Sequence, residues 1–196
     1  MDIVPRVQSI LLKPKEEWVK IKAEPSTVAE LFTSYAMILA AIPAAGQFLG
    51  NILVGRRLPM VGVFRWPLGR ALGNAVVSYV FSLVAIYLFA LIINELAPNF
   101  GSTKNLTSAL KLAVYSMTPG WVAGVLYIIP GLWVLSILAG LYGLYILYLG
   151  FDTPLMETPK DKVVGYLVVS ILVVIALYVV FYLILGGIFA VRYSRI

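Results

Sequence analysis

The side chains of this chain that could take part in chemistry are few and of limited kinds. It has no histidine and no cysteine, which removes thiol nucleophiles, disulfides, iron–sulfur clusters, haem ligation and most zinc or copper sites. Its serines therefore lack a histidine base, and Lys111 lies too near the end of an uncharged stretch to replace one. The sequence predicts a protein that is not an enzyme and that needs no cofactor and no metal.

A stripe of tyrosines is the most distinctive chemical feature. Tyr142, Tyr145 and Tyr148 recur at every third position, so on a helix they form a slowly rotating row of hydroxyls. A buried phenol needs a hydrogen-bond partner. We therefore expect Tyr142 and Tyr145 to face other helices, and at least one hydroxyl to bond within a helical bundle. The row is either a structural polar seam or part of a pocket for a ligand or lipid.

A second candidate for the same seam or cavity is Tyr115, with Thr118 and Pro119. Pro119 cannot donate to the carbonyl of Tyr115 and clashes with it, so the helix should kink there. Thr118 or a water could satisfy the freed carbonyl. The kink either shapes the bundle or provides a hinge or a small polar cavity.

The segment that follows the tyrosines, 152–162, mixes charges of both signs beside an apolar stretch. It is either a solvated connector or a surface for a partner. The candidate partner residues are Asp152, Pro154, Lys160, Lys162 and Tyr166.

Long apolar elements must position all of these residues. The chain is 61% hydrophobic and 12% charged, with a mean hydropathy of +0.96, a balance typical of bilayer proteins. Four stretches carry no charge, and the third is twice the ~20 residues that one membrane-spanning helix needs. Pro130-Gly131 divides it into a hairpin that either crosses the bilayer or re-enters it. We predict an all-α polytopic membrane protein with five transmembrane helices, at about 28–54, 70–93, 108–128, 132–150 and 162–190.

Ahead of this five-helix domain, at 27–196, we predict an N-terminal amphipathic interfacial segment at 1–26. Pro14 should begin a second short helix, on which Trp18 and Ile21 share an apolar face among lysines. Such a face suits the membrane interface, where Trp18 and Ile21 would be anchors. The alternative is docking onto the protein's own loops.

Closely spaced glycines predict where helices approach one another. Gly-x-x-x-Gly pairs and related spacings give a helix a flat face. They serve either internal packing or a homodimer face. The candidate helix-packing residues are Gly46, Gly50, Gly120, Gly124, Gly140 and Gly143.

The net charge of +6 is carried by residues beside the spans, where they attract anionic lipid headgroups and set orientation. We therefore expect the lipid bilayer and not nucleic acid as the partner. Basic residues are more numerous on the side of the N-terminus, which predicts a cytoplasmic N-terminus and a C-terminus on the other side.

Four strings of the chain resemble the prokaryotic branch of the Yip1 domain family: "KPKEEWVKI", "YSMTPGWVAG", "AGLYGLYILYLG" and "PLMETPKDKVVGY". The resemblance implies five spans with a cytoplasmic N-terminus. Eukaryotic members act in Golgi and endoplasmic-reticulum trafficking, bind prenylated Rab-type GTPases and associate with one another. This chain lacks their long N-terminal tail and their Asp-Leu-Tyr-Gly-Pro signature.

These observations together predict a multi-pass protein of a prokaryotic cytoplasmic membrane, acting as a non-enzymatic scaffold or interaction protein in membrane organisation. Its partners would be copies of itself or other membrane proteins. The alternative function is transport or binding of a small molecule or lipid through a polar cavity between spans 3 and 4.

Overall fold

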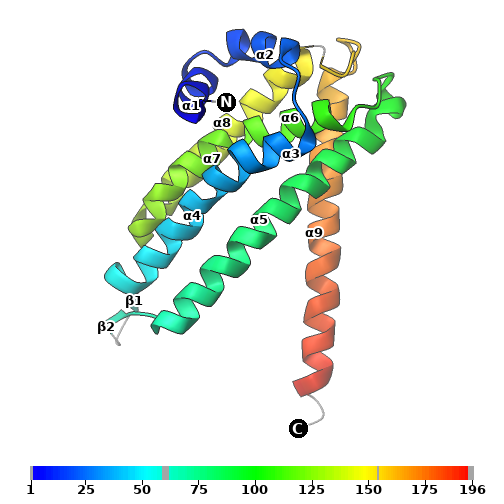
Figure 1. Ribbon diagram of the computed structural model, residues 1–196. Helices are drawn as coiled ribbons and strands as arrows, with labels where there is room; N and C mark the ends of the chain where they lie inside the picture. The colour runs from blue at the N-terminus through cyan, green and yellow to red at the C-terminus, as the bar shows by residue number, and fades with distance from the viewer. Residues whose placement is uncertain (1, 59–61, 154, 194–196) are drawn as a thin grey trace.

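The computed structural model describes residues 2–58, 62–153 and 155–193, which form a bundle of helices with one short β-hairpin (Figure 1). The elements are, in chain order, α1 (Ile3–Leu12), α2 (Pro14–Ala23), α3 (Val28–Leu31), the π-helical turn η1 (Phe32–Ala36), α4 (Met37–Leu49), the π-helical turn η2 (Gly50–Val54), β1 (Arg56–Leu58), β2 (Gly62–Phe64), α5 (Leu68–Leu96), η3 (Ala97–Phe100), α6 (Leu106–Ser116), α7 (Thr118–Ala123), η4 (Gly124–Ile128), η5 (Pro130–Leu132), α8 (Trp133–Asp152) and α9 (Val163–Tyr193).

Three helical stretches within the described residues are long and apolar enough to cross a membrane: Val28–Val54, Leu68–Phe100 and Val134–Asp152. Shorter apolar helices occur at Ile3–Leu12 and Val163–Leu177. The polytopic, predominantly helical character predicted from the sequence is therefore confirmed. The capping box that begins the first stretch is also present, because Thr27 and Glu30 exchange hydrogen bonds.

The predicted third span is broken in the middle. α6 ends at Ser116, and α7 begins at Thr118 with Pro119 in its first turn. The hydroxyl of Thr118 donates to the carbonyl of Tyr115 at 2.7 Å, so it satisfies the acceptor that Pro119 cannot reach. α6 contacts α3, and η4 contacts η2. The α6–η4 segment therefore extends along the first stretch from one end to the other.

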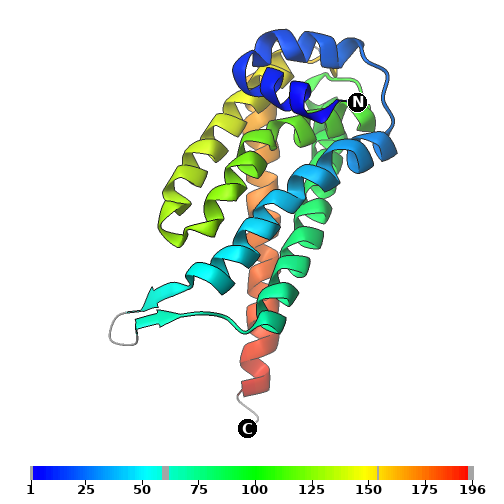
Figure 2. The ribbon, with the colours of Figure 1, turned by 60° about the vertical axis from the view of Figure 1, so that its left-hand side comes forward.

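The connections are sorted to the two ends of the bundle (Figure 1). α1, α2, the α5–α6 connection and the α8–α9 connection lie together at one end. The β-hairpin and the C-terminal end of α9 lie at the opposite end. In Figure 2, α1 and α2 lie across their end of the bundle at a steep angle to α9.

One short segment of this all-α fold is a β-hairpin, which the sequence did not predict. Arg56 to Leu58 pairs antiparallel with Gly62 to Phe64, with Arg56 opposite Phe64. Gly55 ends the preceding helix with φ of 73°, a conformation that glycine adopts without the penalty of a Cβ. The chain therefore leaves the helix abruptly and returns as a hairpin before α5 begins.

The helices expected at 3–22 are present as α1 and α2, and they belong to the hydrophobic core. Ile10, Trp18 and Ile21 are buried in the same cluster as Leu112 and Ile146 of the bundle. The division into 1–26 and 27–196 stays a prediction, but the two parts share this cluster.

Candidate functional site

The site lies where α1 and α2 meet the bundle. The spacing of charged and apolar residues along these two helices explains how it is formed. Arg6 precedes Ile10 by four residues, and Glu17 precedes Ile21 by four. Residues at this spacing share one face of a helix, so each apolar face carries one charged side chain. The turn at Lys13, before Pro14 in the first turn of α2, folds the two faces toward the same core.

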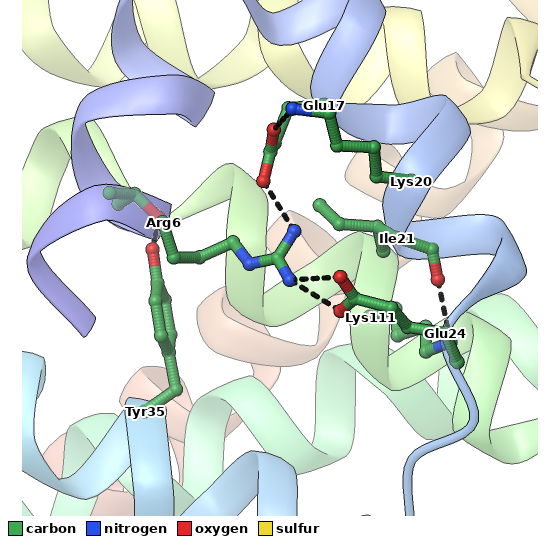
Figure 3. A network of polar contacts seen from close by, with 8 residues as sticks. Arg6, Glu17, Lys20, Ile21, Glu24, Tyr35 and Lys111 are labelled. Carbon is green, nitrogen blue, oxygen red and sulfur yellow. Dashed lines mark hydrogen bonds and ion pairs between the residues drawn. The ribbon is translucent and has the colours of Figure 1, made fainter. Parts of the chain in front are cut away.

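Arg6 stands at the centre of an ion-pair network (Figure 3). Its side chain is 9% exposed, and its two terminal nitrogens donate separately to Glu17 and to Glu24, the latter at 2.5 Å from one carboxylate oxygen. Lys20 pairs with the other oxygen of Glu17 at 3.1 Å. The guanidinium also lies 5.9 Å from the ring centre of Tyr115. The network ties α1 to both ends of α2.

The charge of Arg6 is stabilised within this network. Burial alone would lower the pKa of its guanidinium, but the hydrogen bond with Glu24 and the nearby carboxylates raise it, and the net pKa lies above its ordinary value. Arg6 is therefore a permanently charged cross-link.

Lys111 joins the same end of α2 to α6. Its ammonium donates to the carbonyls of Ile21 and Glu24 at 2.8 and 2.6 Å, and its side chain is buried. These carbonyls lie at the C-terminus of α2, where the helix dipole favours a cation. The sequence argument dismissed Lys111 as a base, and the structure gives it a capping role that spacing alone does not reveal.

Trp18 and Ile21 are buried inside the protein, whereas the anchor prediction requires them to be exposed at a membrane interface. They are 0% and 1% exposed, and the indole nitrogen of Trp18 donates to the carbonyl of Ile146 at 2.9 Å. A Cβ on Gly150 would lie 2.7 Å from the Trp18 ring, so this glycine makes room for the indole. α6 and α8 cover the apolar face of α2, so these side chains dock onto helices of the protein, whereas the alternative prediction named its loops.

Tyr115, Thr118 and Pro119 lie together in the buried interior, as a seam requires. A hydroxyl has one hydrogen to donate, and Thr118 donates its own to the carbonyl of Tyr115. In the 2.8 Å bond between Tyr35 and Thr118, the hydroxyl of Tyr35 is therefore the donor. The rings of Tyr35 and Tyr115 meet edge to face at 4.9 Å. This seam joins the first helical stretch to the kink.

The three tyrosines of α8 have different surroundings: one bonds to another helix, and two are exposed. The hydroxyl of Tyr142 donates to the carbonyl of Leu11 at 2.7 Å, so the expected bond to another helix is made to α1. Tyr145 and Tyr148 are 45% and 39% exposed, which corrects their assignment to the seam. The row turns by about 60° at each step of three residues, and only its first member faces a neighbour.

We expect Tyr142→Phe to destabilise the protein by about 1 kcal/mol, the net value of one intramolecular hydrogen bond. Tyr145→Phe is the matched control, because an exposed side chain usually changes stability by less than about 0.5 kcal/mol. Unfolding of both variants in one detergent measures the difference. Equal effects of the two substitutions would remove Tyr142 from the site.

A polar cavity of about 600 Å³ opens beside Arg6, between α1, α2, α3 and α6. This cavity lies between the N-terminal helices and the bundle, whereas the sequence predicted a cavity between spans 3 and 4. Of the predicted seam residues, Tyr115 contributes to its lining. The charged residues that line it are Asp2, Arg6, Glu17, Lys20, Glu24 and Glu30.

The predicted partner loop is only partly available. Asp152, Lys160 and Lys162 are exposed, whereas Pro154 lies outside the described residues. Tyr166 is buried, donates to the carbonyl of Ile93, and stacks on Phe100 with ring centres 4.8 Å apart. Tyr166 therefore fixes α9 to α5 and cannot serve a partner.

Four of the six candidate glycines lie in close helix contacts. A Cβ on Gly46 would collide with the carbonyl of Gly124, one on Gly50 with that of Tyr127, and one on Gly143 would lie 2.7 Å from that of Ser116. Gly124 itself packs on Pro43. A Cβ on Gly120 or Gly140 would meet nothing within 4 Å among the described neighbours, so these two glycines take no part in the internal packing of the described residues, and the homodimer alternative stays a prediction for them.

The family model described as the Yip1 domain matches residues 9–184, and the chain belongs to the Yip1 domain family of integral membrane proteins. It is similar to "Inner membrane protein YohC" from Escherichia coli strain K12 and from Escherichia coli O6:H1 strain CFT073. In both cases 25% of 150 residues are identical, which covers 75% of this chain and 77% of the relative. No solved structure matches the chain.

Proposed function

We propose that this protein is a five-span protein of the prokaryotic cytoplasmic membrane, with a cytoplasmic N-terminus, that acts as a non-enzymatic scaffold. The five spans would be 28–54, α5, α6 with α7 and η4, α8, and α9. The grouping of α1, α2 and two helix connections at one end supports this topology (Figure 1). The excess of basic residues at that end supports its cytoplasmic side.

The observation that carries the proposal is how the buried charges are used. The charged residues that are buried in the described part of the chain are Arg6, Glu17 and Lys111. Arg6 and Glu17 bond α1 to α2, and Lys111 bonds the C-terminal end of α2 to α6. Because each of these charges is already bonded within the protein, they stabilise a defined architecture.

The same architecture holds a set of exposed charges at one end, which we call the charged end surface. It consists of Lys15, Lys22, Asp161, Lys160 and Lys162. The α8–α9 loop is held to the α5–α6 connection by bonds between Ser102 and Thr158 at 2.9 Å and between Thr103 and Glu157 at 2.7 Å. A surface fixed in this way is suited to a protein partner, because little ordering entropy is lost on binding.

Photo-crosslinking in native membranes tests the scaffold proposal. A photoreactive amino acid at Lys160 or Lys22 is expected to yield discrete protein adducts, including dimers if the partner is a second copy. The same residue at Leu141, which is 57% exposed on an apolar helix, is the control and should yield lipid adducts. Lipid adducts alone at all three positions would contradict the proposal.

The polar cavity favours a second candidate function, binding of a small cationic molecule. Its volume falls within the range of ligand pockets. Four carboxylates line it, and its two cations, Arg6 and Lys20, are already paired with Glu17. Glu30→Gln removes one charge but keeps the capping box. A polyamine such as spermidine should raise the Tm of the wild type more than that of this variant. No shift in either protein would exclude this function.

A further inference from the structure

The outer surface of α1 carries no charge. Its sequence, IVPRVQSILL, contains Arg6 as its one charged residue, and that side chain is buried in the network. On the outside, Val4 is 65% exposed and Leu12 is 79% exposed. A single exposed leucine or valine on a protein surface is ordinary. On α1, however, no charged side chain accompanies the two exposed apolar ones.

α1 also lies deep along the bundle. The carbonyl of Leu11 accepts its hydrogen bond from Tyr142, and α1 contacts α7. Asp152 is the charged residue that ends the apolar stretch of α8. About 15 Å of helix separates Tyr142 from Asp152 at the rise of an α-helix, which is up to half of the ~30 Å hydrocarbon thickness.

The surface of α8 beside this contact is mostly apolar and exposed. Leu138, Leu141 and Tyr145 are between 45% and 57% exposed on a helix apolar enough to span the membrane. The exposed apolar side chains of α1 therefore belong to a helix that contacts α8 beside the exposed apolar face of a candidate membrane span.

α2 has the opposite character. Its outer positions include Lys15, Glu16, Lys20 and Lys22, all exposed. Figures 1 and 2 both place α2 at the extreme end of the molecule and α1 nearer the α7–α8 hairpin. Charged residues at the end and uncharged ones toward the spans are the distribution that a membrane interface imposes.

We propose that α1 is inserted into the lipid of the leaflet next to α8, with Leu12 and Val4 among the acyl chains, and that α2 remains on the aqueous side. The occupant of this face is the bilayer itself. The sequence pattern assigned the interfacial contact to Trp18 and Ile21 of α2, and the structure transfers it to a different helix and a different set of side chains. The burial of Arg6 is what allows α1 to enter lipid, since its charge is neutralised inside the protein.

Site-directed spin labelling tests this directly, because the chain contains no cysteine and each introduced one is labelled alone. We would label Leu12→Cys and Val4→Cys on α1, with Glu16→Cys on α2 as the control, in vesicles of phosphatidylethanolamine and phosphatidylglycerol. Oxygen partitions into lipid, whereas a neutral nickel complex stays in water. The ratio of oxygen to nickel accessibility should be several-fold higher at both α1 sites than at Glu16.

Two results would overturn the proposal. A ratio at Leu12 and Val4 equal to that at Glu16 would place α1 in water. Low accessibility to both reagents at the α1 sites would show that protein, such as a second copy, covers them. Since both positions are more than half exposed, labelling should leave the packing intact, and agreement between two sites guards against a local distortion.

Discussion

Replacing Arg6 by methionine is expected to destabilise the protein by about 3 kcal/mol, the lower end of the range for breaking a buried ion pair. The cost arises mainly from Glu17, which is 5% exposed on its side chain and would lose its buried partner. Glu24 is 46% exposed, so water compensates for much of its loss. Lys20, which is itself exposed, still pairs with Glu17 in this variant. The loss of stability should therefore stay below the upper end of the range for a broken buried ion pair. Unfolding in a single detergent, followed by tryptophan fluorescence, measures the change.

A second substitution distinguishes an ion pair from simple loss of volume. Glu17→Gln added to Arg6→Met removes the stranded charge and should recover much of the lost stability. Lys15→Met is the surface control and should change stability by less than about 0.5 kcal/mol. If Arg6→Met behaves like Lys15→Met, the network does not hold the N-terminal helices.

Gly124→Ala is expected to destabilise the protein by about 3 kcal/mol, the upper end of the range for overpacking a core. A Cβ at this position would lie 2.6 Å from the Cα and 2.7 Å from the nitrogen of Pro43. These are backbone atoms of α4, which cannot yield by a rotamer change. The first helical stretch and η4 would therefore have to separate along their contact. Thermal unfolding of the purified protein measures the loss.

Gly120→Ala is the matched control for this contact. It lies one turn before Gly124, and a Cβ there meets nothing within 4 Å. Since alanine is the better helix former by up to about 1 kcal/mol, this variant should be as stable as the wild type or slightly more so. A similar loss in both variants would mean that glycine flexibility, and not close packing, is what Gly124 provides.

The helical framework was predictable because the bilayer imposes strong rules. Charge-free stretches long enough to cross hydrocarbon predicted the first two helical stretches and α8, and Thr118-Pro119 predicted the break between α6 and α7. The hairpin at Arg56–Phe64 was not predicted, because two strands of three residues leave almost no alternation in the sequence.

The contacts of the N-terminal helices were harder to predict. An apolar face with Trp18 shows that something covers it, but lipid and protein cover such a face equally well. The available signal was Arg6 and Glu17, each on an apolar face four residues before an isoleucine. A charge of either sign at such positions indicates burial against an opposite charge, because an unpaired one would be costly.

The glycines and tyrosines show the limit of spacing arguments. Gly120 and Gly124 form one Gly-x-x-x-Gly pair in the sequence, but Gly120 lies in α7 and Gly124 begins the 3₁₀ turn η4, and of the two Gly124 meets Pro43. Gly150 was not singled out, although it admits the ring of Trp18. Which member of a repeated motif makes a contact depends on where the partner helix lies. The position of the partner helix cannot be predicted from the local sequence of the motif.

Hydrogen–deuterium exchange of the wild-type protein in bilayer nanodiscs tests the central claim most directly, namely that α1 and α2 are an integral part of the bundle. The backbone amides of Ile3–Leu12 and Pro14–Ala23 should exchange as slowly as those of α6, because they share one core with it. Arg6→Met should accelerate exchange in α1 and α2 before it affects α6. Rapid exchange of α1 and α2 in the wild type, with α6 still protected, would contradict the account and return these helices to a loosely held appendage.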